Sequence, residues 1–371
     1  HLSLRRQRQM CIRDRLCSND QFPPLPTTYY PCSVHIWQGV ENYPSDRGHS
    51  VVTIGVFDGV HRGHAQLAHA AADYAAKHGV TALMLSFHPH PSSVVGKGIA
   101  PLRLSTIDFR AQLAQENGID DFVVLNFTPE RAGQEPEDFV KEVLVDRLHA
   151  VHVVVGENFT FGARAAGTPE TLATLGEKYG FTTEIVPLLQ EDGHTVSSTF
   201  IRQSLTESRI QDAIKALGHL PRVEGEVVHG AGRGGRQLGF PTANISFASD
   251  IALPADGVYA GWFAVTDKEP IDGSMEPRKW YPTAVSVGTN PTFDGAVRTV
   301  EAFVLDEDAD LYHRYAVVEF VDRVRGMEKF DSVDDLLQYM NRDVAKTREI
   351  LHNSTVHPTK SVSYTHLTLP T

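Results

Sequence analysis

The sequence lacks the features that mark secreted, membrane-spanning and nucleic-acid-coating proteins. Cysteine is scarce, at 3 of 371 residues, and none follows Cys32, so the rest of the chain can form neither a disulfide framework nor a thiolate metal site. No apolar run approaches the roughly 20 residues that a membrane helix needs. Basic residues are outnumbered, with 34 Lys and Arg against 46 Asp and Glu, a net charge of −12. These absences predict a cytoplasmic protein that does not bind nucleic acid or anionic lipid non-specifically.

The two ends of the chain show no helical or strand pattern. Residues 1–19 lack an amphipathic period, and the last eleven residues read SVSYTHLTLPT. Both ends resemble translated sequencing-adapter sequence, and natural disordered tails are the alternative. We therefore expect residues 1–33 to be a non-native leader, residues 354–371 to be a non-native tail, and the body between them to be long enough for two domains.

Strand-like and helix-like segments alternate through the first half of the body. The expected strands are 51–56, 80–87, 122–127, 151–155 and 182–189, and the expected helices are 64–78, 105–117 with Ser105 as its cap, 136–148, 168–179, 198–205 and 210–217. Strands 51–56 and 151–155 are almost wholly apolar, which is typical of parallel strands covered on both faces. This alternation predicts an α/β domain over residues 34–217 with a doubly wound parallel sheet, whose ligands bind at the carboxyl ends of the strands.

After Gly218 the pattern changes to short β-rich segments separated by Gly, Pro and Asp. The expected strands are 224–228, 258–265, 283–287, 298–305 and 315–321. Such spacing is typical of an antiparallel barrel or sandwich. Apolar residues recur at helical spacing over residues 332–351, beginning with Val333, and we expect this helix to pack on the β layer. The second domain is predicted over residues 218–353.

A phosphate site is predicted where the first strand ends. Residues 51–64 read VVTIGVFDGVHRGH, a buried strand followed by a glycine turn and a helix start. Backbone amides at a helix start bind anions. His61 and His64, which flank Arg-Gly, can point at the same phosphate and stabilise the charge that develops during nucleotidyl transfer. The alternative is a pair of surface histidines on a turn.

Three further segments are expected at or just beyond the same edge of the sheet. Residues 197–202, SSTFIR, combine hydroxyls at a helix start with an arginine one turn later, which suits phosphate; a capped helix with a surface arginine is the alternative. Residues 88–91, HPHP, close the second strand and can equally be a rigid turn. In residues 156–162, GENFTFG, Asn158 can bond a heterocycle edge and Phe159 can hold an aromatic ring or belong to the core.

A second phosphate site is predicted in the second half. Residues 230–244, GAGRGGRQLGFPTAN, combine two arginines with glycines that let the backbone approach a phosphate. A flexible loop and an arginine–glycine RNA-binding tract are the alternatives, and the acidic net charge weakens the latter. Thr242 and Asn244 alternate along an extended segment and offer oxygens of the kind that Mg²⁺ accepts. Glu301, inside a predicted strand, can deprotonate a hydroxyl near a phosphate or can simply face solvent.

These motifs occur in an order that resembles one known family. GVFDGVHRGH, PHP, GENFTFG and SSTFIR resemble the N-terminal module of the bifunctional prokaryotic riboflavin kinase/FMN adenylyltransferases (FAD synthetases), a nucleotidylyltransferase module. GFPTAN, SVGTNPTFDG, VEAFVLD and MEKFDS are similar to the riboflavin kinase module of that family. The resemblance covers about Ile36 to Leu351. It implies a Rossmann-like parallel sheet, followed by a six-stranded antiparallel Greek-key barrel with a C-terminal helix.

The resemblance implies that the first module binds ATP and FMN. The implied ATP-binding residues are Gly55, Phe57, Asp58, His61, Gly63, His64, Ser197, Ser198, Thr199 and Arg202. The implied flavin-binding residues are Pro89, His90, Pro91, Asn158 and Phe159. With His61, His64 and Arg202 as the catalytic residues, the FMN phosphate would attack the α-phosphate of ATP and release pyrophosphate, giving FAD.

The resemblance implies that the second module phosphorylates riboflavin. The implied ATP-binding residues are Gly230, Gly232, Arg236, Gly239, Phe240, Pro241, Thr242 and Asn244. Thr242 and Asn244 would hold Mg²⁺, and Glu301 would be the base that activates the riboflavin 5′-hydroxyl for attack on the γ-phosphate of ATP.

Two residues depart from the family pattern, namely His88, where Asp precedes Pro-His-Pro, and His313, where Gly follows Tyr. Two other functions stay open from the residues alone. The first module can adenylylate another phosphorylated acceptor, such as a pantetheine phosphate, or the chain can be a non-catalytic flavin or nucleotide sensor. The expected partners are small-molecule substrates, with a homo-oligomer as an open question.

Overall fold

The computed structural model describes residues 34–96, 100–230, 240–292 and 295–359. Its first unit is a six-stranded parallel sheet in the order β1-β4-β3-β2-β5-β6. The strands are β1 (His35–Gln38), β2 (Ser50–Ile54), β3 (Thr81–His88), β4 (Asp121–Asn126), β5 (Ala150–Gly156) and β6 (Thr182–Val186). All five predicted strands of this domain are present, and β1 is an edge strand that the sequence did not indicate.

Helices cover both faces of this sheet because its strands are apolar on both sides. The helices of the chain before the barrel are α2 (Arg62–His78), α3 (Pro91–Val95), α4 (Ile107–Glu116), α5 (Pro129–Ala132), α6 (Pro136–Phe139), the π-helical η2 (Val140–Arg147), α7 (Pro169–Tyr179), α8 (Ser198–Thr206) and α9 (Ile210–Leu217). In β2, Val51 packs in the core formed with α2 and α4, whereas the next residue, Val52, packs in the core formed with η2 and α7. The predicted doubly wound sheet is therefore confirmed.

Most helix ends follow the expected signals. Gly79 ends α2 and Gly180 ends α7, both with positive φ, and Thr168 caps the start of α7. The expected cap at Ser105 is wrong, because Thr106 accepts the N-terminal hydrogen bond of α4 from Phe109 N–H. The Ser105 hydroxyl is instead used in the loop after β2, as described below.

The second unit is a closed antiparallel barrel in the order β10-β13-β12-β11-β14-β9. Its strands are β9 (Arg222–Val228), β10 (Ala243–Ser246), β11 (Gly257–Val265), β12 (Tyr281–Thr292), β13 (Gly295–Val304) and β14 (Tyr315–Arg325). Tyr259, Phe263 and Phe320 fill its core. The predicted six-stranded barrel is confirmed, although β10 was expected only as an extended segment and β12 is longer than predicted. A small hairpin, β7 (Gln190–Glu191) and β8 (His194–Thr195), precedes α8.

The C-terminal helix α11 (Val333–Asn353) packs on the barrel, as predicted, but not along its whole expected apolar face. Val333 is 56% exposed, whereas Thr347 and Leu351, in the second half of the helix, are buried. A bidentate ion pair between Arg325 of β14 and Asp343 also holds the helix, with N–O distances of 2.8 to 3.1 Å. Among the described residues no helix, α11 included, is long and apolar enough to cross a membrane.

Residues 354–359 continue from α11 and pack against the barrel. The Thr359 backbone N–H and hydroxyl donate to the buried Glu319 carboxylate at 3.0 and 2.7 Å. The Trp280 indole N–H donates to the Thr359 carbonyl at 3.0 Å. Residues 354–359, which were assigned to the tail, therefore pack against the barrel. The remaining parts of the predicted ends, residues 1–33 and 360–371, lie outside the described residues.

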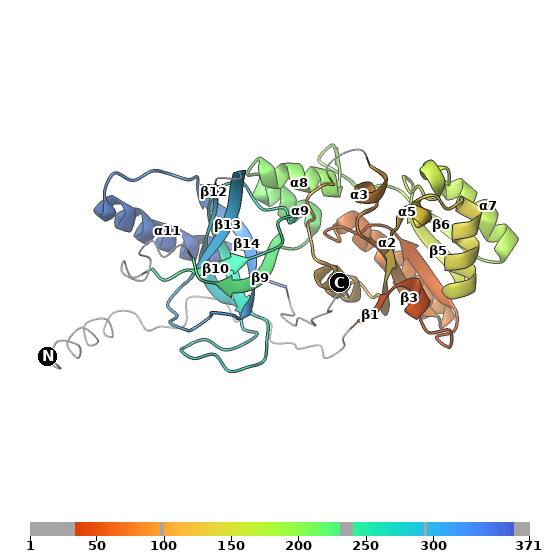
Figure 1. Ribbon diagram of the computed structural model, residues 1–371, viewed down its shortest axis with the longest axis horizontal. Helices are drawn as coiled ribbons and strands as arrows, with labels where there is room; N and C mark the ends of the chain where they lie inside the picture. Colours follow the sequence, from red (N-terminus) through yellow and green to blue (C-terminus); the bar gives the residue numbers. More distant parts are fainter. Residues whose placement is uncertain (1–33, 97–99, 231–239, 293–294, 360–371) are drawn as a thin grey trace.

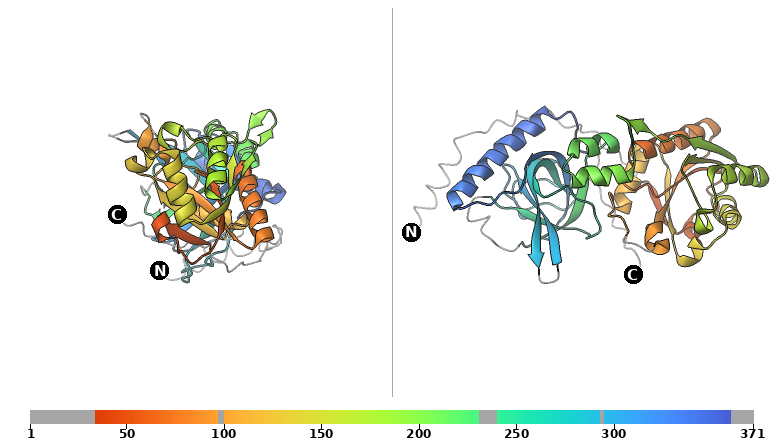
Figure 2. Two further views of the ribbon diagram at one scale, coloured as in Figure 1. Left: turned by 90° about the vertical axis from the view of Figure 1, so that its right-hand side faces the viewer. Right: turned by 90° about the horizontal axis from the view of Figure 1, so that it is seen from above.

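The helices α8 and α9 lie between the sheet and the barrel (Figures 1 and 2). Ile210 and Ile214 of α9 belong to the barrel core. Ala213 and Leu217 on another face of α9 pack instead with Leu205 of α8. The helix α9 is therefore shared by the two units, and the chain passes from its end directly into β9.

Candidate active sites

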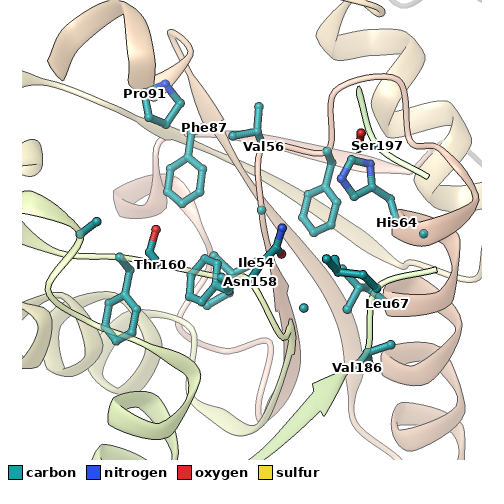
Figure 3. A pocket seen from close by; sticks show the side chains of 18 of the residues that line it. Ile54, Val56, His64, Leu67, Phe87, Pro91, Asn158, Thr160, Val186 and Ser197 are labelled. Carbon is teal, nitrogen blue, oxygen red and sulfur yellow. The ribbon is translucent and has the colours of Figure 1, made fainter. Parts of the chain in front are cut away.

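A cavity of about 620 Å³ opens at the carboxyl edge of the parallel sheet. Its wall includes Gly55 after β2, Phe87 of β3, Asn158 after β5 and Val186 of β6. Figure 3 shows Phe87, Asn158 and His64, from three different elements, around the same space. The wall is mostly apolar with a few polar groups, as in pockets that take an aromatic ligand.

The cavity brings together many, but not all, of the residues expected at this site. The expected residues that line it are Gly55, Phe57, His61, Gly63, His64, Ser197, Pro91, Asn158 and Phe159. The expected residues outside its lining are Asp58, Ser198, Thr199, Arg202, Pro89 and His90. His90 caps α3, because its Nδ1 accepts the Ser92 N–H at 3.1 Å. His90 therefore supports α3, whose first residue, Pro91, lines the cavity.

The loop after β2 has an unusual backbone. We call residues 57–64 the histidine turn. Phe57 and Val60 have φ values of 53° and 35°, in the left-handed region that only glycine adopts readily, and Gly59 has a φ of 79°. Within this turn, the Nδ1 atom of His61 accepts the His64 N–H at 3.4 Å and so caps α2. Both histidines are therefore held at the N-terminus of a 17-residue helix.

The two imidazoles of this turn stack, with ring centroids 3.6 Å apart and an interplanar angle of 17°. Burial lowers the pKa of His61 to about 4 and lowers the pKa of His64 well below its usual value. Both rings are therefore neutral near pH 7, and each carries one N–H donor. The His64 Nδ1 atom is buried without a hydrogen-bond partner among the described residues. A buried polar atom without a partner at a cavity wall is what a bound polar ligand would satisfy.

The lowered pKa of His61 predicts a loss of stability in acid. In the unfolded chain the ring has its ordinary pKa of 6.5 and takes up a proton below it, whereas the folded ring stays neutral down to about pH 4. Protons then favour the unfolded state, by about 2 kcal/mol between pH 7 and pH 5. Urea unfolding at the two pH values measures this loss, and His61→Asn should lose about 2 kcal/mol less. Equal losses in both proteins would contradict the prediction.

Asp58 is a buried support for the histidine turn. It is 2% exposed, and its carboxylate pairs with Arg110 at 3.2 Å and with Arg202 at 2.6 Å. It also accepts the Leu104 N–H at 2.9 Å. The Ser198 hydroxyl donates to the Asp58 carbonyl at 2.9 Å. The start of α8 therefore holds the histidine turn through Ser198, and Arg202 forms an ion pair with Asp58.

The sequence did not indicate several residues of this site. Arg110 was missed, although an arginine on the apolar face of a predicted helix can signal a buried ion pair. Arg131 and Arg164 also line the cavity, and Arg131 pairs with Glu142 at 3.0 Å. Residues 187–189, which follow β6 and also line the cavity, were assigned to a strand, although their place beyond a strand end would have suggested the site.

In the barrel, the expected metal and base residues come together on one face. Asn244 of β10 lies directly opposite Glu301 of β13, so their side chains share a face of the sheet. The Thr242 hydroxyl donates to the Glu301 carboxylate at 3.4 Å. Glu301 alternates with Val300 and Ala302, which are buried in the core, so it lies on the outer face of the wall. These hydroxyl, amide and carboxylate oxygens are the hard donors that suit Mg²⁺.

The expected nucleotide loop of the barrel is described at its two ends only. A Cβ atom on Gly230 would lie 2.5 Å from the Asn244 amide, so only glycine fits this close approach. The Phe240 ring lies 5.1 Å from the Phe303 ring, and Pro241 follows it as an exposed residue. The other expected residues, Gly232, Arg236 and Gly239, lie outside the described residues.

The structure accounts for one of the two departures from the family pattern. His313 has a φ of 62°, in the region that glycine favours, so the turn keeps a glycine-like backbone. Its Nδ1 lies 2.9 Å from the Glu226 carboxylate. His88 ends β3 and is half-buried, and burial lowers its pKa. Nothing in the structure explains why His88 stands there.

Comparisons with known proteins agree over both units. A family model described as FAD synthetase matches residues 43–200, and one described as riboflavin kinase matches residues 217–351. The bifunctional riboflavin kinase/FMN adenylyltransferase of Escherichia coli (strain K12) is 32% identical over 81% of this chain and 92% of the relative. Relatives with the same name from Pseudomonas fluorescens and Bacillus subtilis (strain 168) are 32% and 29% identical over 84% of this chain and 96% and 95% of their own lengths.

A solved structure from Streptococcus pneumoniae, described as a macrolide-efflux protein, has a similar fold. It is 29% identical, with a TM-score of 0.75, and the match covers 85% of this chain and 99% of that one. Coverage of that extent includes both the sheet and the barrel. The likeness therefore concerns the two-unit fold as a whole.

Proposed function

The chain belongs to the family of bifunctional riboflavin kinases/FMN adenylyltransferases, and we propose that the two sites described above carry its two activities. Residues 34–217 would adenylylate FMN to FAD, and residues 218–353 would phosphorylate riboflavin to FMN. One observation carries the first assignment: an apolar cavity that ends at two stacked, neutral histidines at a helix N-terminus. Substitutions that remove one activity and spare the other test this division.

In adenylyl transfer, the flavin ring would lie against the apolar wall of the cavity, near Pro91, Asn158 and Phe159. An oxygen of the FMN phosphate would attack the α-phosphorus of ATP, and the bond to the β-phosphate oxygen would break, releasing pyrophosphate. His61 and His64 would donate N–H groups to the α-phosphate oxygens, on which negative charge grows. Arg202 would act through Asp58, because the structure pairs these two charges at 2.6 Å.

In riboflavin phosphorylation, Glu301 would take the proton from the 5′-hydroxyl. The resulting oxygen would attack the γ-phosphorus of ATP, and ADP would leave. Thr242 and Asn244 would hold Mg²⁺, which supplies positive charge to the phosphates when bound. The cross-strand pairing of Asn244 with Glu301 supports this assignment, because it sets the base beside the proposed metal ligands.

The proposed Mg²⁺ site predicts a selective defect in Asn244→Ala. We expect the Mg²⁺ concentration for half-maximal kinase rate to rise about tenfold, because one oxygen donor is lost. Calorimetry of ADP binding with and without Mg²⁺ gives a second readout, in which the variant should lose most of the Mg²⁺-dependent gain. The matched control is Ser246→Ala, two residues along the same strand. Unchanged Mg²⁺ dependence in folded Asn244→Ala would remove Asn244 from the site.

We further propose a cytoplasmic enzyme that works on small molecules alone, with neither nucleic acid nor a membrane as partner. The net charge of −12 supports this, since an acidic surface does not attract phosphate backbones or anionic lipid. A homo-oligomer is compatible with this proposal, and light scattering measures it.

A further inference from the structure

The linker between the two units lies directly against the histidine turn. A Cβ atom on Gly59 would lie 3.2 Å from the Leu217 side chain, at the end of α9. A Cβ atom on Gly218 would lie 2.9 Å from the Arg62 side chain, at the start of α2. The next residue, His219, has its Nε2 atom 2.9 Å from the Gly59 carbonyl oxygen. Three consecutive residues therefore touch the turn or its helix before the chain enters the barrel.

His219 joins segments that are 160 positions apart. A carbonyl oxygen only accepts, and a neutral imidazole carries one proton, so the ring donates to Gly59 in the tautomer that has the proton on Nε2. The Nδ1 atom lies 3.0 Å from the carbonyl oxygen of Leu220, the adjacent residue. Burial lowers the pKa of His219, and its ring packs edge-on against Phe109 at 5.4 Å. The contact that connects distant parts of the fold is thus the one with Gly59.

The Gly59 carbonyl belongs to the peptide plane that precedes Val60. Val60 and Phe57 hold left-handed backbone angles, which persist only when surrounding contacts hold them. The Gly59 N–H is also held, because it donates to the Ser105 hydroxyl at 2.8 Å. Both sides of Gly59 are therefore fixed, one by the sheet unit and one by the linker. The direction in which His61 leaves the turn follows from these angles.

The barrel is also connected to the histidine turn through residues 103–105. Arg103 forms a bidentate ion pair with Asp250 at 2.6 and 2.7 Å, and its backbone bonds with Asp250 and Ala252. The two residues that follow Arg103 hold Asp58 and Gly59 through a backbone N–H and a hydroxyl. Residues 103–105 therefore connect the loop between β10 and β11 to the histidine turn.

We propose that His219 is a positioning residue for adenylyl transfer. Its N–H bond to Gly59 orients the peptide before Val60 and keeps His61 and His64 directed at the cavity, so the linker to the kinase unit is part of the adenylyltransferase site. The inference rests on the proposed role of the histidine turn. It assigns His219 no part in riboflavin phosphorylation.

His219→Phe tests this, because it keeps a ring against Phe109 and removes the donor. We expect kcat for FAD formation from FMN and ATP to fall about 10- to 100-fold, with each KM changed less than about threefold, because misoriented catalytic groups slow chemistry more than binding. His219→Gln, which restores an N–H donor, should recover most of the rate. FMN formation from riboflavin and the melting temperature should stay close to those of the unsubstituted protein. His219→Met supplies a second side chain without a donor.

Two results would overturn the proposal. One is an unchanged kcat for FAD formation in a folded donor-free variant. The other is a parallel loss of both activities with a lowered melting temperature and no rescue by glutamine, which is the behaviour of a residue needed only for stability. The His64→Ala variant keeps this test separate from the proposed function. Full FAD synthesis by that variant would remove the histidine turn from the chemistry whatever His219 does.

Discussion

The His64→Ala variant is expected to form FAD from FMN and ATP about 100- to 1,000-fold more slowly than the unsubstituted protein. The His64 ring lines the cavity, stacks on His61 and has a buried Nδ1 atom with no partner among the described residues. A donor fixed in advance at the place where phosphate charge develops stabilises the transition state more than the ground state. We therefore expect the loss in kcat, with smaller changes in the KM values for FMN and ATP.

The same variant should phosphorylate riboflavin at the ordinary rate, because the proposed kinase residues lie on the outer wall of the barrel. Chromatographic separation of riboflavin, FMN and FAD measures both products in one reaction. The matched control is His69→Ala, an exposed histidine on the same helix, which should leave both rates unchanged. Loss of FMN synthesis in folded His64→Ala protein would show that the division between the two units is wrong.

The sequence predicted this site because the carboxyl ends of parallel strands meet at one edge of a sheet. His64 follows β2 and Asn158 follows β5, which are neighbouring strands, and both line the cavity. An apolar run and a glycine turn are local signals, so the order of residues reveals them. The same edge rule would also have suggested the residues after β6 if the end of that strand had been set at Val186.

The contacts that support the site could not be predicted in this way. Asp58 meets Arg110 across 52 positions and Arg202 across 144, and the pairing depends on how α4 and α8 pack behind the turn. The tilt of a helix is decided by the packing of many side chains, and no periodicity records it. The short strands β1 and β10 were not predicted for a different reason. Each has four residues, too few to show a repeating pattern.

In the barrel, too, the features that depend on neighbouring residues could be predicted, and those that depend on strand pairing could not. Thr242 and Asn244 alternate along the chain, so a shared face was predictable. Their approach to Glu301 depends on the register between β10 and β13, in which Asn244 lies opposite Glu301. A shift of that register by one residue would turn Glu301 away from both. The proposed base therefore depends on the barrel closing in this register.

The Glu301→Gln variant is expected to lose riboflavin phosphorylation by about 100- to 10,000-fold, because an amide cannot accept the proton of the 5′-hydroxyl. Glutamine has nearly the same shape, and it can still bond to the Thr242 hydroxyl, which now lies 3.4 Å from the carboxylate. The barrel should therefore keep its stability, and the loss should appear in kcat, with the KM for riboflavin nearly unchanged. FAD formation from added FMN should continue at the ordinary rate.

The matched control for this variant is Glu276→Gln, at an exposed carboxylate elsewhere on the barrel that pairs with Lys279 at 2.8 Å. It should leave both activities unchanged, since such surface pairs contribute little. Initial rates of FMN formation from riboflavin and ATP measure the loss in each variant. A folded glutamine variant with an ordinary rate would show that another group, or the solvent, takes the proton.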